Sequence, residues 1–153
     1  KNIMLQSNYI PSKIIRKIPN SFMTDITGFG LAYHAINLSQ KIPYSSIELN
    51  ISKIKFLSTA LNLSNSGISS SLYEENLNLV KLIKDDLQEK NKEKVKLLFD
   101  PQTSGGILAA VPKSESERCL RKLLRIGYDA SIIGKIHVRN NEKKNSNTLL
   151  IKN

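Results

Sequence analysis

The chain has 153 residues, of which 40% are hydrophobic and 24% are charged, as in ordinary globular domains. This length fits one compact domain, and no run of about 18 apolar residues is present, so the sequence predicts no membrane-spanning helix. The formal charge is +10, but the lysines are scattered and the aromatic residues rarely lie among them, so a basic nucleic-acid-binding module is the less favoured interpretation.

The first elements in the chain are predicted to be helical. The N-terminal residues lack a basic stretch followed by an apolar one, so we expect no signal peptide, and Lys1 in place of a methionine suggests a fragment of something longer. Residues 3–16 predict a helix that Pro11 interrupts or begins anew. After a polar link, a second helix is expected from about residue 27 to residue 40, because its apolar residues fall on one face.

The middle of the chain gives weaker signals. Residues 45–51 alternate in polarity as a strand does, and residues 53–67 predict a helix that Gly67 closes. Residues 74–90 favour a helix, but their helical signal is weak. The serine-rich stretch at residues 64–71 is the best candidate for a mobile loop.

The last third predicts a regular alternation of elements. A short apolar run at residues 106–111 precedes an amphipathic helix at 113–127, and the β-branched stretch at 130–138 reads as a strand. A polar turn at 142–147 and a closing strand at 148–152 would complete a hairpin. These elements predict an α+β fold, a layered α/β sandwich with a mixed sheet.

The only cysteine, Cys119, lies within the predicted amphipathic helix. A single cysteine excludes a disulfide framework and suits a reducing, cytoplasmic setting. No histidine or other base lies near it in the sequence, so we expect a buried structural side chain and not a nucleophile.

Four of the seven glycines gather in two patches. The first patch, residues 23–34, has Asp25 followed by Gly28 and Gly30 at an expected helix start. Glycines let a backbone approach a ligand, helix N-termini attract phosphate, and Mg²⁺ would reconcile a carboxylate with a phosphate. The alternative, favoured on spacing alone, is that Asp25 or Thr24 caps the helix.

The second patch, residues 98–111, begins with the turn-forming pair Asp-Pro and feeds an apolar run. Spacing alone favours a tight turn before a core strand over a binding loop. Neither patch has the Gly-Lys-Ser/Thr of a P-loop or the three glycines of a dinucleotide fingerprint. The candidate binding residues of the second patch are Gln102, Thr103, Ser104, Gly105 and Gly106.

The two histidines, His34 and His137, lie far apart in the sequence. With one cysteine they make a zinc site improbable. His34 follows Gly30 by about one helical turn on a mostly apolar segment, so we expect it to be a packed or capping residue.

The two patches carry a family resemblance. Thr-Asp-Ile-Thr-Gly-Phe-Gly-Leu before His34, then Asp-Pro-Gln-Thr-Ser-Gly-Gly, then Ile-Ile-Gly resembles the C-terminal half of selenophosphate synthetase (selenide, water dikinase). The family has Thr-Asp-Val-Thr-Gly-Phe-Gly at the first motif and the same string at the second. The resemblance implies the fold of the C-terminal domain of aminoimidazole ribonucleotide synthetase, with residues 1–153 as a single domain.

What the resemblance implies about function goes beyond the spacing. The family makes selenophosphate, AMP and phosphate from selenide, ATP and water, with Mg²⁺ between aspartates and the ATP phosphates. By position Asp25 would be the one metal-binding aspartate of the C-terminal domain, which raises the metal interpretation above the capping one. The residues expected to line the cleft are Thr27, Gly28, Gly30, Gln102, Thr103, Ser104, Gly105 and Gly106.

The resemblance also implies what lies elsewhere. The catalytic cysteine or selenocysteine and its lysine belong to an N-terminal domain of the same polypeptide, so we expect no catalytic residue in this chain, no turnover by it alone, and a homodimer of the full protein. Met23 and the pair Ala32-Tyr33 depart from the family pattern around the motif, not at the metal position. The alternatives left open are another ATP-using member of the superfamily, or a non-catalytic paralogue.

Overall fold

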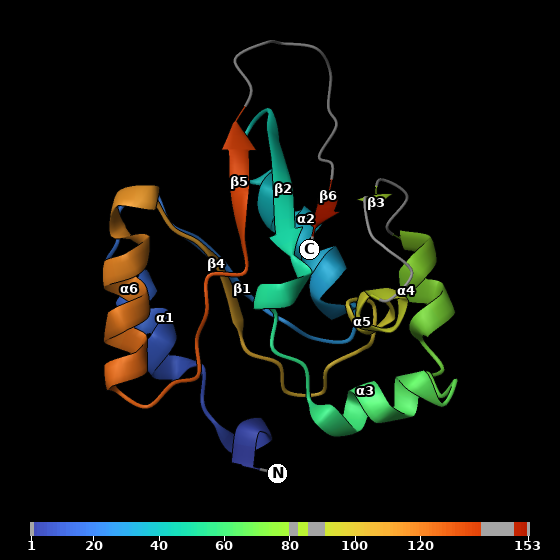
Figure 1. Cartoon of the computed structure of the whole chain (residues 1–153). Helices are drawn as coiled ribbons and strands as arrows, with labels where there is room; N and C mark the ends of the chain where they lie inside the picture. Colours follow the sequence, from blue (N-terminus) through green and yellow to red (C-terminus); the bar gives the residue numbers. More distant parts are fainter. Residues whose placement is uncertain (1, 80–82, 86–90, 139–148, 153) are drawn as a thin grey trace.

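The computed structural model of the chain describes residues 2–79, 83–85, 91–138 and 149–152. Within them, two β-sheets lie between two groups of helices (Figure 1). The helices are η1 (Asn2–Leu5), α1 (Tyr9–Ile15), α2 (Gly30–Gln40), η2 (Ile51–Lys53), α3 (Ser58–Asn65), α4 (Tyr73–Leu79), α5 (Lys92–Leu97) and α6 (Lys113–Arg125). The strands are β1 (Phe22–Asp25), β2 (Ser45–Asn50), β3 (Ile83–Asp85), β4 (Ile107–Ala110), β5 (Gly134–Val138) and β6 (Leu149–Lys152).

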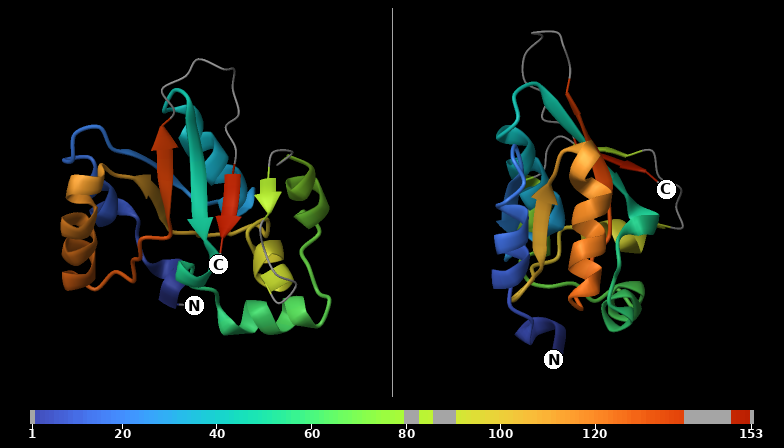
Figure 2. Two further views of the ribbon diagram at one scale, coloured as in Figure 1. Left: turned by 45° about the horizontal axis from the view of Figure 1, so that its top comes forward. Right: turned by 90° about the vertical axis from the view of Figure 1, so that its left-hand side faces the viewer.

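The larger sheet has the strand order β3-β6-β2-β5 and is mixed. Strand β6 runs parallel to both β2 and β3, whereas β5 runs antiparallel to β2. The smaller sheet is the antiparallel pair of β1 and β4. Helices α1 and α6 lie beside the smaller sheet, and α3, α4 and α5 lie on the opposite side of the molecule (Figures 1 and 2). The predicted α+β class with a mixed sheet is confirmed.

The predicted hairpin at the C-terminus is wrong. Strand β2, from the middle of the chain, lies between β5 and β6 and pairs with both, so the last two strands do not pair with each other. Local sequence favours neighbouring strands, but β2 buries alternate residues on one face and takes the central position. The predicted turn at 142–147 lies outside the described residues.

Several helix boundaries differ from the predicted ones. The first helix is divided into η1 and α1, and Pro11 lies in the first turn of α1, where its missing N–H removes no helical hydrogen bond. The third helix, α3, begins at Ser58 and not at residue 53. Of the weak segment at 74–90, α4 ends at Leu79 and residues 83–85 form β3. The expected glycines after helices α3 and α6 have φ values of +78° at Gly67 and +85° at Gly127.

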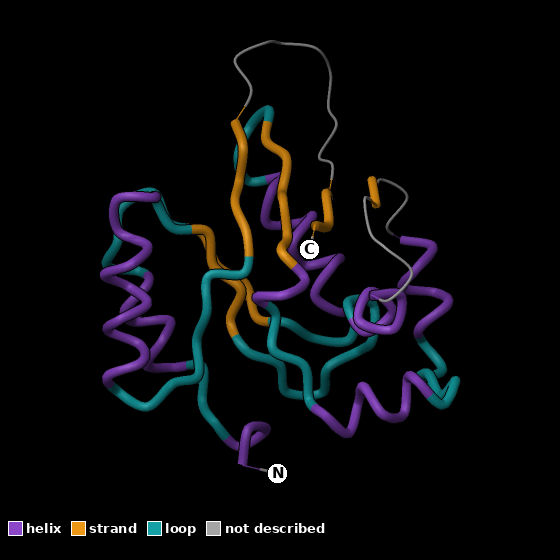
Figure 3. The backbone as a smooth tube through the Cα atoms, in the orientation of Figure 1, coloured by secondary structure: helices purple, strands orange, loops and turns teal. Residues whose placement is uncertain are grey.

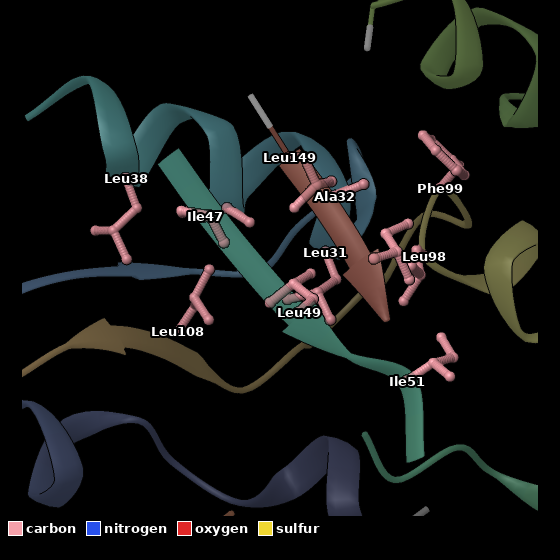
Figure 4. Close-up of a cluster of buried hydrophobic side chains, with 12 residues drawn as sticks. Leu31, Ala32, Leu38, Ile47, Leu49, Ile51, Leu98, Phe99, Leu108 and Leu149 are labelled. Atoms are coloured by element: carbon pink, nitrogen blue, oxygen red, sulfur yellow. The ribbon is translucent and has the colours of Figure 1, made fainter. Parts of the chain in front are cut away.

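The core forms where α2 covers the larger sheet and the ends of both glycine patches (Figure 4). Helix α2 contributes residues one turn apart, β2 and β6 contribute alternate residues, and the chain after α5 contributes two consecutive ones. Its members are Leu31, Ala32, Ala35, Leu38, Ile47, Leu49, Ile51, Leu98, Phe99, Leu108, Leu149 and Ile151. The core therefore anchors the helix that follows the first patch and the segment that begins the second.

Candidate functional site

The two glycine patches come together in space. The first patch begins in strand β1 and the second patch ends in strand β4, and these strands pair so that Asp25 lies opposite Ile107. The loops continue this pairing: the Ile26 N–H donates to the Gly106 carbonyl at 3.0 Å, and the Gln102 N–H donates to the Thr27 carbonyl at 3.1 Å. Figure 3 shows the two loops running from the small sheet toward α5. The two patches, whose residues are expected to line one cleft, are therefore in contact.

One glycine in each patch is required by packing between the loops. Gly30 is buried with a φ of +75°, and a Cβ on it would lie 2.7 Å from the Leu98 carbonyl oxygen. In the second patch, a Cβ on Gly105 would overlap the Ile26 carbonyl oxygen. Both clashes involve backbone, which cannot move aside as a side-chain end can. Close packing of the second patch against the backbone of the first thus accounts for Gly105.

The other glycine in each patch is not explained in this way. A Cβ on Gly28 or on Gly106 would meet no atom within 4 Å. Neither residue has the positive φ that favours glycine over other residues. Packing within the described residues therefore leaves space beside both positions.

Asp25 is the last residue of β1 and is exposed. Sequence reasoning placed it in a loop at a helix start near residue 27, and that was wrong: α2 begins at Gly30. The N-cap residue is Phe29, without a side-chain capping bond, so the capping interpretation of Asp25 and Thr24 is also wrong. The strand is only four residues long, and the pairing with β4 that creates it is not visible in the local sequence.

His34 fixes the loop that follows Asp25. Its side chain is 8% exposed, and its Nε2 accepts from the Thr27 N–H at 3.0 Å and lies 3.1 Å from the Thr27 hydroxyl. Burial lowers the pKa of His34, and the negative charge of Asp25 offsets part of that shift. Of the two predicted roles, packed or capping, the packed one is confirmed, since Thr27 precedes the N-cap residue Phe29.

Side chains distant in the sequence also hold the two loops, and sequence reasoning missed them. The buried Asn76 of α4 donates from Nδ2 to the carbonyl oxygens of Gly28 and Phe99, each at 2.9 Å. At the N-terminal end of the chain, the Asn8 amide donates to the Gly105 carbonyl at 3.1 Å. A single sequence carries no signal for such contacts, because they depend on tertiary structure.

The remaining candidates of the second patch are more open. Thr103 and Ser104 are exposed, and Gln102 is half-buried. The Ser104 hydroxyl donates to the Met4 carbonyl at 2.8 Å, which ties this loop to η1. The side-chain oxygen of Gln102 lies near Gly105, so a Cβ there would approach it to 2.7 Å.

A pocket of about 250 Å³ lies between α3, α4 and α5. Asp100 of the second patch is part of its wall, together with Tyr73, Lys96 and residues of the serine-rich loop, but Asp25 and the four patch glycines are not. The expected cleft along both patches is thus a different feature from this pocket, and it stays a prediction.

Asp25 offers one carboxylate for a metal. Among the described residues, no group of three or more His, Cys, Asp and Glu side chains is arranged to hold an ion.

His137 lies on the larger sheet, 3.2 Å from a carboxylate oxygen of Glu48, and Cys119 is buried in α6, where burial raises its thiol pKa. A zinc site from these residues and a nucleophilic role for Cys119 find no support in this arrangement.

No protein-family model matches the chain. Of the curated relatives, the selenide, water dikinase of Campylobacter jejuni strain RM1221 is 39% identical over 133 residues, and that of Aliarcobacter butzleri is 36% identical over 138 residues. The enzyme of the same name from Caldanaerobacter subterraneus subsp. tengcongensis is 31% identical over 138 residues. These matches cover 87–88% of the chain but only 37–39% of the relatives.

In the part of the chain that the structure describes, no helix has the length and apolar character needed to span a membrane. Of the three motifs that carry the resemblance, the two in the glycine patches lie in contact at the junction of β1, β4 and α2, whereas Ile-Ile-Gly leads into β5. Together with identities of up to 39% over most of the chain, this confirms the resemblance to selenophosphate synthetase: the chain is homologous to a segment of the selenide, water dikinase family.

Proposed function

We propose that this chain is the C-terminal domain of an ATP-dependent selenophosphate synthetase. The whole enzyme would convert selenide, ATP and water into selenophosphate, AMP and phosphate. The observation that carries the proposal is the exposed carboxylate of Asp25 at the junction of two loops that backbone hydrogen bonds hold together. The match to selenide, water dikinases supports the same assignment.

Asp25 would hold Mg²⁺ at the edge of the nucleotide site. The donor set fits this ion, because Mg²⁺ uses one or two protein carboxylates and completes its shell with waters and phosphate oxygens. The bound ion would supply electrostatic stabilisation of charge on the phosphoryl groups. The chain's contribution is to keep Asp25 exposed at a strand end that is paired with β4 and followed by a loop that His34 holds.

The open glycines would allow the nucleotide to come close. Beside Gly28 and Gly106 there is space where another residue would place a side chain. Backbone N–H groups in glycine loops near a helix start suit phosphate oxygens. We propose that Thr27, Gln102, Thr103 and Ser104 line this surface together with Gly28 and Gly106, and that the enclosed Gly30 and Gly105 support it from behind.

The remaining parts of the reaction would lie outside this chain. We propose that an N-terminal domain of the same polypeptide supplies the catalytic cysteine or selenocysteine and its lysine, and that the full protein is a homodimer. This chain alone would then bind neither the whole nucleotide nor selenide productively. We expect the 153 residues by themselves to show no ATP turnover, and turnover by them would contradict the two-domain proposal.

The experiment that tests the metal role is Asp25→Asn in the full-length protein. The change removes the charge and keeps the shape, so we expect ATP turnover to fall by about 100-fold or more, as when a charge-stabilising group is lost. Because Asp25 is exposed, the thermal midpoint should hardly change. AMP release and thermal denaturation measure the two quantities.

The matched control is Asp129→Asn, which removes another exposed aspartate that lies outside both patches. That variant should turn over ATP like the unchanged protein. Unchanged turnover in Asp25→Asn would remove the metal role, whereas an equal loss in both variants would point to a general effect of charge.

A further inference from the structure

Asn76 occupies an unusual position for an amide side chain. It belongs to the seven-residue helix α4 and is only 3% exposed. Lys, Glu, Asn and similar residues are mostly found at the surface, and burying an amide is costly unless it is hydrogen-bonded. Its burial therefore calls for a structural reason.

The reason is a bond to each of the two patches. One nitrogen, Nδ2, donates to the Gly28 carbonyl of the first patch and to the Phe99 carbonyl of the second, both at 2.9 Å. An amide nitrogen has two hydrogens, so both are used. A single side chain thus bridges the two loops, in addition to the backbone hydrogen bonds between them.

The first of these bonds also sets the orientation of the peptide group between Gly28 and Phe29. A trans peptide is planar, so fixing the Gly28 carbonyl toward α4 turns the Phe29 N–H in the opposite direction. Gly28 itself has no packing partner at the Cβ position that would fix this peptide. Asn76 therefore supplies the constraint that the open glycine lacks.

Helix α4 makes a second contact with the same region. The ring of Tyr73, one turn before Asn76, meets the ring of Phe99 edge-on with centroids 6.5 Å apart. This contact supports Phe99 but involves no hydrogen bond to either patch. It offers a matched control, because Tyr73→Phe keeps the aromatic ring and leaves both hydrogen bonds of Asn76 intact.

We propose that Asn76 is a positioning residue, which aligns the Gly28 and Phe99 backbones so that Asp25 and the second patch face the same nucleotide. The expected effect of Asn76 on activity rests on the proposed function. The expected effect of Asn76 on the conformation of the two loops does not. Asn76 acts through the backbone and does not itself touch the substrate.

The test compares Asn76→Ser with Tyr73→Phe in the full-length protein, by hydrogen–deuterium exchange and by turnover against Mg²⁺ concentration. Serine has one hydroxyl donor and cannot replace both bonds. We expect amide exchange to quicken about tenfold in residues 26–30 and 98–106 of Asn76→Ser, as loss of a buried hydrogen bond implies. Exchange in β2 should stay unchanged, and Tyr73→Phe should resemble the unchanged protein.

In the activity arm, a positioning role predicts that Asn76→Ser needs about tenfold more Mg²⁺ for half-maximal ATP turnover. A merely structural role would lower kcat through loss of folded protein and leave the Mg²⁺ requirement unchanged. A uniform rise in exchange, unchanged exchange in both loops, or a variant that does not fold would overturn the positioning role. Absence of ATP turnover in the unchanged protein would instead defeat the proposed function, and the exchange measurement would still decide the role of Asn76 in the loops.

Discussion

The two glycine patches carry the same kinds of residue but are held in different ways. The first patch leaves a strand and enters α2, and it is fixed from inside the core by His34 and Asn76. The second patch connects α5 to β4; Asn76 also binds its Phe99 carbonyl, and the Asn8 amide and the contact of Ser104 with Met4 tie it to the N-terminal residues. In each, one glycine is enclosed by backbone and the other faces open space.

This difference separates two reasons for having glycine. The enclosed pair, Gly30 and Gly105, makes the loops fit each other, and that need would exist without any ligand. The open pair, Gly28 and Gly106, has no such need in the described structure. A motif of four glycines therefore mixes positions that packing requires with positions that packing within the described residues does not explain.

Substituting the enclosed glycines should have the largest effect on stability, and it tests the division into enclosed and open glycines. We expect Gly30→Ala and Gly105→Ala each to lower the free energy of unfolding by about 3 kcal/mol, because the added methyl group meets backbone atoms and overpacking of that kind costs roughly 1–3 kcal/mol or more. Gly30→Ala adds the strain of a left-handed conformation. Denaturant unfolding of the purified protein measures the loss.

The control for Gly30→Ala is Gly67→Ala. Gly67 has a similar φ of +78° but nothing within 4 Å of its Cβ position, so its substitution reports the backbone strain alone. That cost should be about 1 kcal/mol. If the two substitutions lower the free energy of unfolding equally, the contact of Gly30 with the second patch contributes nothing to stability. Gly30 would then not belong with the glycines that packing requires.

A smaller effect should come from the titration of His34, which fixes only the first patch. Burial lowers its pKa from the ordinary value of 6.5, so the unfolded chain binds the proton more readily than the folded one. The stability that neutral His34 provides is complete above pH 6.5 and declines as the pH falls from there through the lower pKa of the folded state. Unfolding experiments at about pH 5 and about pH 7.5 measure this dependence.

The matched variant is His34→Gln, which has no titrating group at that position. It should be less stable than the unchanged protein near neutral pH, because the bond to the Thr27 N–H is lost or weakened. Its stability should also vary less between the two pH values. An equally steep pH dependence in His34→Gln would assign the effect to other groups and leave the first patch without this support.

The sequence predicted those parts of the molecule that depend on local pattern or on a long specific motif. Helices α2 and α6 and strand β2 have clear periodicity, and the unbroken Asp-Pro-Gln-Thr-Ser-Gly-Gly string pointed to the family. It also suggested that the two patches meet, as β1 and β4 bring about. The periodic elements depend mainly on neighbouring residues, whereas the meeting of the patches was implied by the family motifs and not by local pattern.

What could not be predicted depends on long-range contacts. Strand β1 is short and lacks alternation, so only its partner β4 makes it a strand, and this moved Asp25 from a loop to a strand end. The insertion of β2 between β5 and β6 involves strands far apart in the sequence. Asn76 lies in the middle of the chain, where the sequence gives weaker signals, and its two bonds become visible only in three dimensions.

The smallest effect on stability should come from the open glycines, and it sharpens the comparison most. We expect Gly28→Ala and Gly106→Ala to change the free energy of unfolding by no more than about 0.5 kcal/mol, because each new methyl group meets no atom and neither φ is positive. In the full-length protein the same methyl groups would lie where the phosphates of ATP are proposed to approach. The apparent KM for ATP should therefore rise in a protein that is as stable as before. Stable variants with an unchanged KM would mean that the space beside Gly28 and Gly106 serves no nucleotide, and the division of the patches into packing and binding glycines would fail at its functional half.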